Sequence, residues 1–551
     1  MPRLPLLCAI VWALLAAPLA TPLAAHDVAA DRARLERDVR ILADDDMEGR
    51  ESGTRGYAAA AGYVAGRFAS IGLQTGGDED TYFQTVTLQR SRDTRPPTLT
   101  LTIDGEEITG EAYVDFYGGG SSRFLEGDVW ADLVFIGYGL QLPEHGRDDF
   151  AGVDLKGKIA VRAYGAPSYL NTEELAHLRT TSGQRLSAQG AIGSILLWTP
   201  VIDRMIKFDQ AAQGARGGDS VTWVDPQGVA YTPSPNIRAG VVISPELSRR
   251  LLAGEAFDYD ALLAAEQSER ADLPSFPMKA KARITYANTF ERFTDANVIG
   301  ILPGSDRALA DQYVVLTAHL DHLGIKANEE TGDDEIFNGA MDNATGVAAM
   351  LEVARLLAQN PPRRPVMFVA LAAEEQGLLG SSFHAHNPNL PDGASLAVNV
   401  NLDMPILTYP FEDVNAFGAE RSNIYPYVQA AVEESGLTLS PDPNPELGLF
   451  VRSDQYSYIQ RGVPAIYLKT STAGIGAEGQ AAFLARHYHQ PSDEVELVSW
   501  EQLGRFADVN FLIARNVANM DARPAWLAGD FFGTLFDGPM VRSDGVGSDG
   551  K

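Results

Sequence analysis

The sequence contains a single cysteine, Cys8, among its 551 residues. One cysteine excludes a disulfide framework, a zinc ribbon and a Cys-x-x-Cys redox site. It also excludes a thiol nucleophile if Cys8 is removed during maturation. Any metal in this protein must therefore be bound by histidine, aspartate and glutamate side chains.

Basic residues are scarce as well, with 44 Lys and Arg against 73 Asp and Glu, which gives a net charge of -29. This balance argues against nucleic acid as a partner, because phosphate binding requires clustered basic side chains. Hydrophobic residues make up 45% and charged residues 21% of the chain, which is the range of folded globular proteins. The length predicts two to four domains.

Long hydrophobic runs are absent except near the start, where residues 4–20 follow Arg3. The small residues at 23–25 then precede a polar segment, which is typical of a secretory signal peptide cleaved after about Ala25. A retained membrane anchor is the alternative, but the run is slightly short and is interrupted by Pro18. We therefore expect an exported protein, periplasmic or extracellular, with no membrane attachment after cleavage.

The pattern of residue types changes twice along the chain. From about residue 128, short apolar runs alternate with Gly, Pro and Asp, which is typical of a β-rich module. After about residue 287, strand, loop and helix patterns alternate, which predicts an α/β domain. We expect a signal peptide over 1–25, the N-terminal part of the main domain over 26–127, an insert over 128–285, the main domain over 286–525 and a C-terminal tail over 526–551.

Compact apolar runs in the main domain predict strands buried in a central sheet. The predicted strands cover 313–318, 366–371, 396–402 and 465–468, and the predicted helices cover 31–42, 57–71, 344–359 and 424–435.

Histidine and carboxylate side chains lie next to these predicted elements at five places. They are His319 and Asp321 after the strand over 313–318, Asp342 before the helix over 344–359, Glu374 and Glu375 after the strand over 366–371, Asp403 after the strand over 396–402, and His489 before Pro491. Each alone has an ordinary structural explanation, such as helix capping. Open α/β sheets, however, bind ligands at the carboxyl ends of their strands. Adjacent carboxylates after a buried strand are costly unless a positive charge neutralises them, and a metal does this most simply.

The strings around these residues resemble those of the dizinc exopeptidases of metallopeptidase family 28, which include secreted bacterial aminopeptidases and glutamate carboxypeptidases. The strings are AHLDHLG at 318–324, MDNATGVA at 341–348, AEEQG at 373–377, NLDM at 401–404 and YHQPSD at 488–493. The resemblance covers most of residues 290–520. It implies an α/β fold with a mixed central sheet and helices on both faces.

A second string, DFAGVDLKGK at 149–158, resembles the protease-associated domain that is inserted in several peptidases. The resemblance implies that this β-rich domain forms the insert. An ordinary β domain with turns is the alternative.

Carried over residue by residue, the resemblance implies two Zn²⁺ ions. One would be held by His319, Asp342 and Asp403, and the other by Asp342, Glu375 and His489, with Asp342 as the bridge. It implies that Glu374 is the general base, and that Asp321 binds the ring of His319 and fixes its tautomer. Many relatives have a second aspartate where this chain has Met341, a change that we expect to spare the ligand.

The chemistry of such a site agrees with peptide hydrolysis. Two zinc ions share a water, lower its pKa and stabilise the oxygens of a tetrahedral intermediate. Glu374 can then accept the proton of that water and pass it to the leaving amine. We expect surface or loop roles for the neighbouring His322 and His487, and we expect Ser453 and Asp454 to lie near the substrate.

Other functions remain open at this point. A binding protein on the same fold should lack a ligand or the base, whereas this chain has all of them. A transferase of the glutaminyl-cyclase type would use one zinc and would not need the His319-x-Asp321 pair. The glycine-rich string at 474–479 matches a dinucleotide fingerprint, but no βαβ unit follows it, so we expect a loop at the rim of the site. Serine hydrolase and His-Glu-x-x-His motifs are absent.

The direction of the exopeptidase is the least defined point. A free α-ammonium suits an acidic cleft, so the sequence favours an aminopeptidase that acts on peptides. A carboxypeptidase would need a basic residue in the cleft, which Arg452, Arg461 or Lys469 could supply. Side-chain preference and oligomeric state are not indicated.

Overall fold

A computed structural model of the protein describes residues 29–167, 169–217, 219–268, 272–326 and 334–541. The signal peptide expected over 1–25 lies outside these residues, as does Cys8. Within the described ranges, no helix combines the length and the apolar composition that crossing a bilayer requires.

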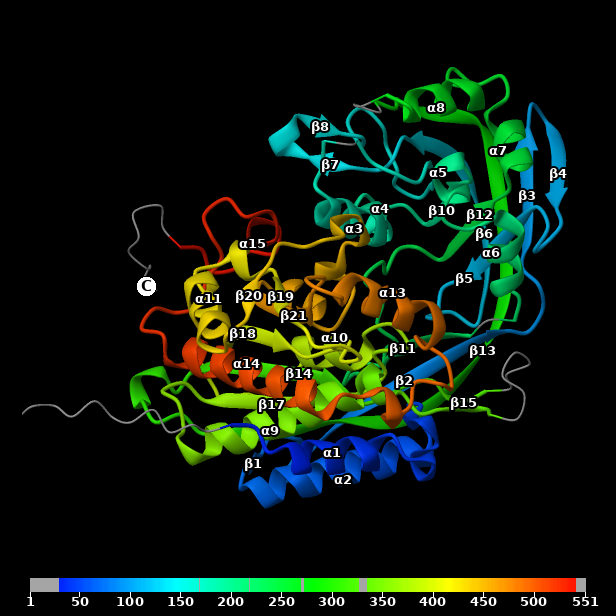
Figure 1. Cartoon of the computed structure of the whole chain (residues 1–551). Coiled ribbons are helices and arrows are strands. Elements are labelled where there is room, and N and C mark those ends of the chain that lie inside the picture. Colours follow the sequence, from blue (N-terminus) through cyan, green and yellow to red (C-terminus); the bar gives the residue numbers. More distant parts are fainter. Residues whose placement is uncertain (1–28, 168, 218, 269–271, 327–333, 542–551) are drawn as a thin grey trace, which may run out of the picture.

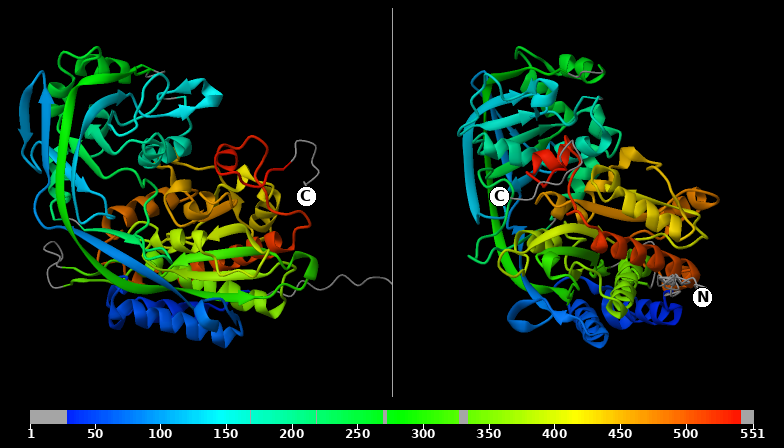
Figure 2. Two further views of the ribbon diagram at one scale, coloured as in Figure 1. Left: turned by 180° about the vertical axis from the view of Figure 1, so that it is seen from behind. Right: turned by 90° about the vertical axis from the view of Figure 1, so that its left-hand side faces the viewer.

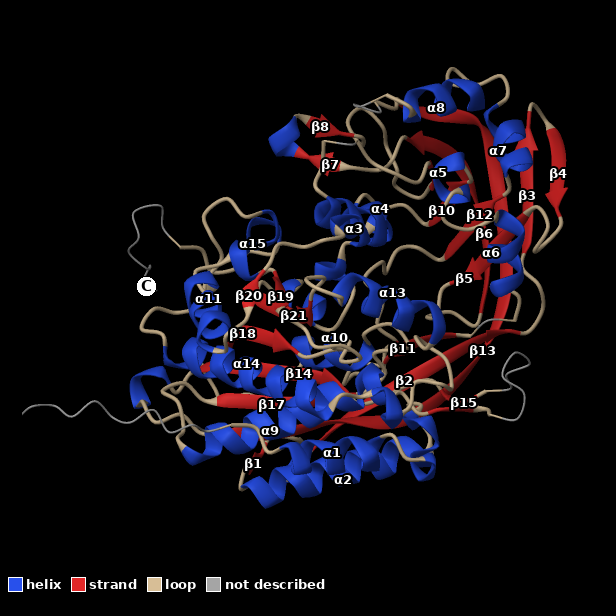
Figure 3. Cartoon of the chain, viewed as in Figure 1, coloured by secondary structure: helices blue, strands red, loops and turns tan. Residues whose placement is uncertain are grey.

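The main domain is built on one mixed sheet whose strands run in the order β11, β2, β13, β17, β14, β18, β21, β19, β20 (Figures 1 and 3). The strands are β2 (Phe83–Asp93), β11 (Ser220–Trp223), β13 (Ser275–Leu302), β14 (Gln312–His319), β17 (Val366–Leu371), β18 (Ser395–Asn401), β19 (Asp413–Phe417), β20 (Thr438–Leu439) and β21 (Ala465–Thr470), with β1 (Gln74–Thr75) on β13. Strands β17, β14, β18 and β21 are parallel, so their carboxyl ends meet at one edge.

The four central strands confirm the strands predicted from apolar runs, to within two residues at each end. Every residue of β17 is buried, which explains why its sequence, VMFVAL, has no polar position.

Helices cover both faces of this sheet (Figures 1 and 3). One face carries α1 (Arg32–Leu42), α2 (Arg55–Ile71), α9 (Thr345–Gln359) and α14 (Trp500–Asn519) in one large apolar core, with α11 (Tyr425–Glu434) beside α14. The other face carries α10 (Leu379–His386) and α12 (Gln455–Ile459). Helix α2 begins where the Thr54 hydroxyl accepts from the Tyr57 amide, and it ends at Gly72, whose φ of 90° suits only glycine well.

A second mixed sheet forms the insert, in the order β5, β12, β10, β9, β6, β13, β3, β4. Besides β13, its strands are β3 (Thr98–Ile103), β4 (Glu106–Gly110), β5 (Phe116–Gly120), β6 (Glu126–Ile136), β9 (Ile159–Arg162), β10 (Gly193–Leu197) and β12 (Ala239–Ile243). Two short antiparallel pairs lie outside both sheets: β7 (Gln141–Leu142) with β8 (Arg147–Asp148), and β15 (Gly324–Ile325) with β16 (Ile336–Phe337). Strand β13 belongs to both sheets and joins them along one side of the molecule (Figure 2).

This pairing moves the boundary of the insert. We expected residues 26–127 to belong to the main domain, but β3, β4 and β5 pair with strands of the second sheet. The insert also contains helices that its β-rich texture did not reveal. They are α3 (Thr172–Thr180), α4 (Ser182–Ala188), α5 (Pro200–Asp203), α6 (Phe208–Gly214), α7 (Pro245–Leu252) and α8 (Tyr259–Glu266).

Helix α3 of the insert packs on the main domain next to the C-terminal segment. His177 lies 2.6 Å from the hydroxyl of Tyr456, and Glu173 forms an ion pair with Arg421, which also binds Asp530 at 2.9 Å. The C-terminal segment continues into α15 (Phe531–Leu535), so residues 526–541 of the expected tail are folded, with Trp526 fully buried.

Candidate metal centre

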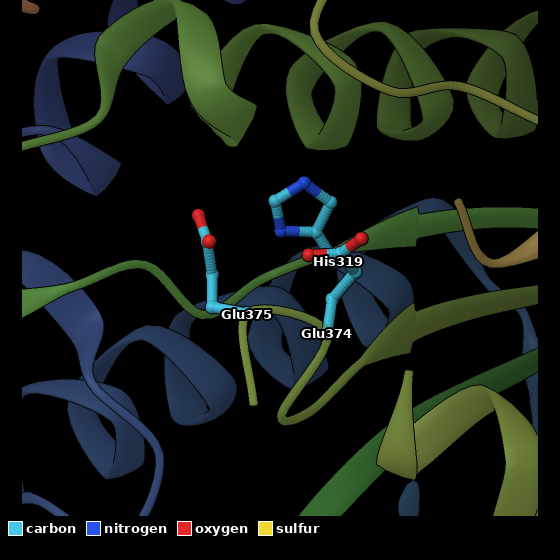
Figure 4. A group of neighbouring side chains, drawn as sticks. All are labelled: His319, Glu374 and Glu375. Carbon is cyan, nitrogen blue, oxygen red and sulfur yellow. The ribbon is translucent and has the colours of Figure 1, made fainter. Parts of the chain in front are cut away.

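Five of the predicted site residues converge at the carboxyl edge of the parallel strands. His319 is the last residue of β14, and Asp403 follows β18 by two positions. The Nε2 atom of His319 lies 3.2 Å from Oδ1 of Asp403 and 3.2 Å from Oδ1 of Asp342. Glu374 and Glu375 follow β17, and their side chains extend to the same side as the His319 ring (Figure 4).

Asp342 faces a second histidine through its other oxygen. Nε2 of His489 lies 3.4 Å from Oδ2 of Asp342 and 3.3 Å from Oε2 of Glu375. The two oxygens of Asp342 therefore point at two different groups of ligand atoms, one containing His319 and Asp403 and the other containing His489 and Glu375.

These distances fit metal ligation. A tetrahedral zinc with nitrogen and oxygen ligands at about 2.0–2.1 Å holds its ligand atoms about 3.3 Å from one another. The separations of 3.2–3.4 Å between these nitrogen and oxygen atoms agree with that spacing, so the donor atoms stand about as far apart as a bound ion would require.

Burial and neighbouring charges shift the pKa values of two of these groups, His319 and Glu374. Burial lowers the pKa of His319, but the carboxylates of Asp403 and Asp342 outweigh this effect and raise that pKa well above its ordinary value. Burial also raises the pKa of Glu374 well above its usual range, and the nearby carboxylates of Asp454 and Asp403 add to the shift. The site thus concentrates negative charge that a cation would relieve.

Part of the chain matches a known peptidase family. Residues 297–514 match the family model described as peptidase family M28. The chain is 27% identical over 226 residues to Aminopeptidase YwaD of Bacillus subtilis, covering 40% of this chain and 44% of that protein. It is 32% identical over 221 residues to Aminopeptidase Y of Saccharomyces cerevisiae, covering 38% and 36%. The chain thus spans less than half the length of these relatives.

Residues 297–514 form a peptidase family M28 domain. Among solved structures, an aminopeptidase from Aneurinibacillus sp. strain AM-1 aligns over 88% of this chain and 93% of its own, with 21% identity and a TM-score of 0.46.

Asp493 of the M28 domain fixes the position of Asp342, a role that the sequence did not reveal. Its buried carboxylate accepts hydrogen bonds from the amides of Met341, at 2.9 Å, and Asp342, at 3.0 Å. Met341 itself is fully buried in the apolar core. Asp493 is the last residue of the string YHQPSD at 488–493, and the only sequence signal for its role is its position four residues after the predicted ligand His489.

The expected role of Asp321 needs correction. Its carboxylate does not bind the His319 ring; instead, it accepts from the amides of Glu374, at 3.0 Å, and Glu375, at 3.2 Å. The backbone carbonyl of Asp321 lies 3.1 Å from Nδ1 of His319 and orients the ring. The physical reason is the path of the backbone after β14, which places the carbonyl of Asp321, and not its side chain, against the ring. Burial raises the pKa of Asp321 to about 8.

Two neighbouring histidines differ in their surroundings. His322, for which we expected a surface or loop role, is in a loop but is buried, and its Nδ1 lies 2.7 Å from Oε1 of Glu375. His487 is at the surface and lies 2.9 Å from the hydroxyl of Ser492, as expected. Ser453 donates to Asp403 at 2.5 Å, so it holds a predicted ligand, and Asp454 is buried next to Glu374.

Arg50 lies outside the M28 domain but supports two of the loops that carry predicted ligands. It is 1% exposed, and its guanidinium donates to the carbonyls of Leu320 at 2.9 Å, Leu42 at 2.5 Å, Asn338 at 2.7 Å and Gly339 at 2.9 Å. Burial lowers its pKa to about 10, and the carboxylates of Asp493 and Asp321 oppose that change, so the group stays charged at neutral pH. The sequence showed only a glycine-rich loop here.

A cavity of about 250 Å³ opens directly from these residues. Glu374 and Tyr488 line it next to the predicted ligands, and Tyr488 stacks on the ring of His489. Of the three cations considered for a carboxypeptidase, Arg452 and Lys469 line the cavity, whereas Arg461 does not. Helix α13 (Gly476–Arg486), which begins within the glycine-rich string at 474–479, contributes Gln480 and Leu484 to the wall.

Proposed function

We propose that this protein is a zinc-dependent aminopeptidase that removes N-terminal residues from peptides. The observation that carries the proposal is the placement of Asp342, which lines the cavity and whose two oxygens lie 3.2 Å from His319 and 3.4 Å from His489. The relatives named aminopeptidases support this activity.

His319, Asp342 and Asp403 would hold one zinc ion, and Asp342, Glu375 and His489 would hold the second. Bound there, the two ions would supply a water of lowered pKa and positive charge for the oxygen of the scissile carbonyl. The donor set of two histidines and three carboxylates suits zinc, and manganese or cobalt are possible substitutes.

The chain's own residues would perform the remaining steps. Glu374 faces the cavity without being one of the five ligands, so it is free to accept a proton from water and to deliver it to the leaving amine. The backbone carbonyl of Asp321 keeps Nε2 of His319 directed at the site.

The lining of the cavity favours an aminopeptidase over a carboxypeptidase. The N-terminal residue of a peptide would lie in the cavity beside the ligands. The free α-ammonium of that residue would meet the carboxylates around Asp403, as an acidic cleft requires. A carboxypeptidase would instead anchor a terminal carboxylate on Arg452 or Lys469.

N-acetylation distinguishes the two directions. We expect the protein to cleave free dipeptides and to lose nearly all activity on the N-acetylated forms, because acetylation removes the positive charge and adds bulk where the cavity closes. C-terminal amidation should have little effect. Equal cleavage of free and N-acetylated dipeptides, or loss of activity on amidation alone, would overturn the aminopeptidase assignment.

We also propose that the protein is exported and that the insert is a protease-associated domain. Helix α3 of the insert packs on residues 445–451, where Ala176 approaches Gly448, and Leu447 and Leu449 of that segment line the cavity. The insert therefore supports one wall of the proposed substrate site.

A further inference from the structure

One part of the cavity wall combines apolar surface with a cation that has no ion-pair partner among the described residues. The apolar side chains are Ile406, Phe417, Leu447, Leu449 and Leu484. Lys469 projects among them from β21, directly beside Asn415 of β19. A wall made only of apolar side chains would select an apolar substrate residue. The lysine in this wall therefore indicates that the bound substrate residue carries a polar or charged group.

Lys469 is nine-tenths buried, with 9% of the residue exposed. Among the described residues, its ammonium forms no ion pair within 4 Å and no side-chain hydrogen bond, and the ring of Tyr467 lies 5.4 Å away. Burying an ammonium group without an ion-pair partner costs free energy, and an anionic ligand that pairs with the group offsets this cost. We therefore expect an anion to bind next to Lys469.

The carboxylates near Lys469 are committed to the metal centre. Asp403 and Asp342 are the acidic groups whose charge acts on this lysine. Under the proposed function, the charges of Asp342, Glu374, Glu375 and Asp403 are balanced by two divalent cations. The positive charge of Lys469 then has no counter-charge in the centre itself.

The remaining charges at the cavity do not cancel this lysine. Arg452 is exposed at the same cavity and carries a second positive charge. Asp442 also lines the cavity, but within the described part of the chain it forms no ion pair with either cation. With the ligands neutralised, the wall that faces the ligands carries a net positive charge.

We propose that this cavity binds the acidic side chain of an N-terminal glutamate or aspartate, with its carboxylate paired to Lys469 and steered by Arg452. This inference rests on the proposed aminopeptidase function, because it places the N-terminal residue in the cavity. The methylene groups of glutamate would contact the apolar side chains, and the carboxylate would form charge-assisted hydrogen bonds with the ammonium. A basic N-terminal side chain would be repelled.

The test compares glutamyl, glutaminyl and leucyl p-nitroanilides on the zinc-loaded full chain. Glutamine has nearly the shape of glutamate without its charge, so the ratio of their kcat/KM values reports the charge alone. We expect the glutamyl substrate to be preferred over the glutaminyl one by at least about tenfold. Equal values for the three substrates would overturn the proposal.

Lys469→Met retains the length of the side chain and removes its charge. We expect kcat/KM for the glutamyl substrate to fall by about 30-fold or more, with little loss for the leucyl substrate and an unchanged zinc content. Arg461→Met is the matched control, because Arg461 lies outside the cavity, and it should change none of these values. A uniform loss on all three substrates in Lys469→Met would assign the lysine to the metal centre and contradict the inference.

Calorimetric titration with free L-glutamate and L-glutamine separates this inference from the proposed activity. Tighter binding of glutamate that is lost in Lys469→Met supports the pocket even if no nitroanilide is cleaved, and in that case only the aminopeptidase assignment fails. Cleavage of the leucyl substrate with equal binding of the two amino acids overturns the pocket and leaves the activity intact.

Discussion

Replacing Arg50 by lysine tests how the metal centre is held in place. The guanidinium of Arg50 donates to four carbonyls from three segments, and two of the acceptors, Leu320 and Gly339, lie within three residues of His319 and Asp342. An ammonium group has three donors and lacks the planar fork, so lysine must leave at least one carbonyl without its partner.

The magnitude follows from the loss of these bonds. A hydrogen bond from a charged donor contributes about 1.5–3 kcal/mol, so Arg50→Lys should lower the free energy of unfolding of the metal-free chain by about 2–3 kcal/mol. Arg50→Met would remove every bond and approach the total stability of a domain, about 5–15 kcal/mol, which makes lysine the usable variant. Because the ligand loops lose their support, zinc affinity should fall by about 10- to 100-fold.

Arg364→Lys is the matched control. Arg364 is fully buried and donates to the carbonyls of Met520 and Ala522 and to Gln312, which are not part of the metal centre. Both variants should lose similar thermal stability without metal, but only Arg50→Lys should lose zinc in competition with a chelator. Equal zinc affinity in the two variants would show that Arg50 stabilises the fold alone and would refute this reasoning.

Three further predictions concern the base, the shared ligand and the insert. Glu374→Gln should keep zinc and fold while kcat falls by about 10² to 10⁴-fold, whereas Glu375→Gln should lose zinc first. Steady-state kinetics together with elemental analysis distinguishes the two variants. An undiminished kcat in Glu374→Gln would exclude Glu374 as the base. Asp342→Ala should lose both zinc ions together in a chelator titration, and retention of one tightly bound ion would contradict its bridging position. Burial lowers the pKa of His177 to about 3, against about 6.5 when unfolded, so the unfolded chain binds more protons and stability is lost as pH falls from about 6.5 towards 3. The difference corresponds to about 5 kcal/mol, and urea unfolding should show a flatter pH dependence in His177→Gln; identical slopes would contradict it.

The central strands and most of the candidate site could be predicted from the sequence. Strands β14, β17 and β18 are buried on both faces, so each is a compact apolar run that is visible without a structure. His319, Glu374 and Asp403 follow these runs closely, and the parallel arrangement brings strand ends together. The prediction that they converge needed no knowledge of the loops.

Long-range backbone contacts could not be predicted in this way. Arg50 and Leu320 are 270 residues apart, and nothing in either segment records their contact. The 28-residue strand β13 belongs to two sheets, so its burial pattern changes partway along and reads as two unrelated segments. The carboxylate of Asp321 has partners that the sequence does not predict, because the direction of this side chain depends on the path of the backbone after β14.

The number of zinc ions bound per chain tests the central claim most directly. We expect elemental analysis of the purified protein, dialysed against metal-free buffer, to find two zinc equivalents, because Asp342 presents one oxygen to each of two ligand groups. A single equivalent would contradict the shared role of Asp342. The absence of any bound metal in a chain that still cleaves peptides would contradict the metal centre itself.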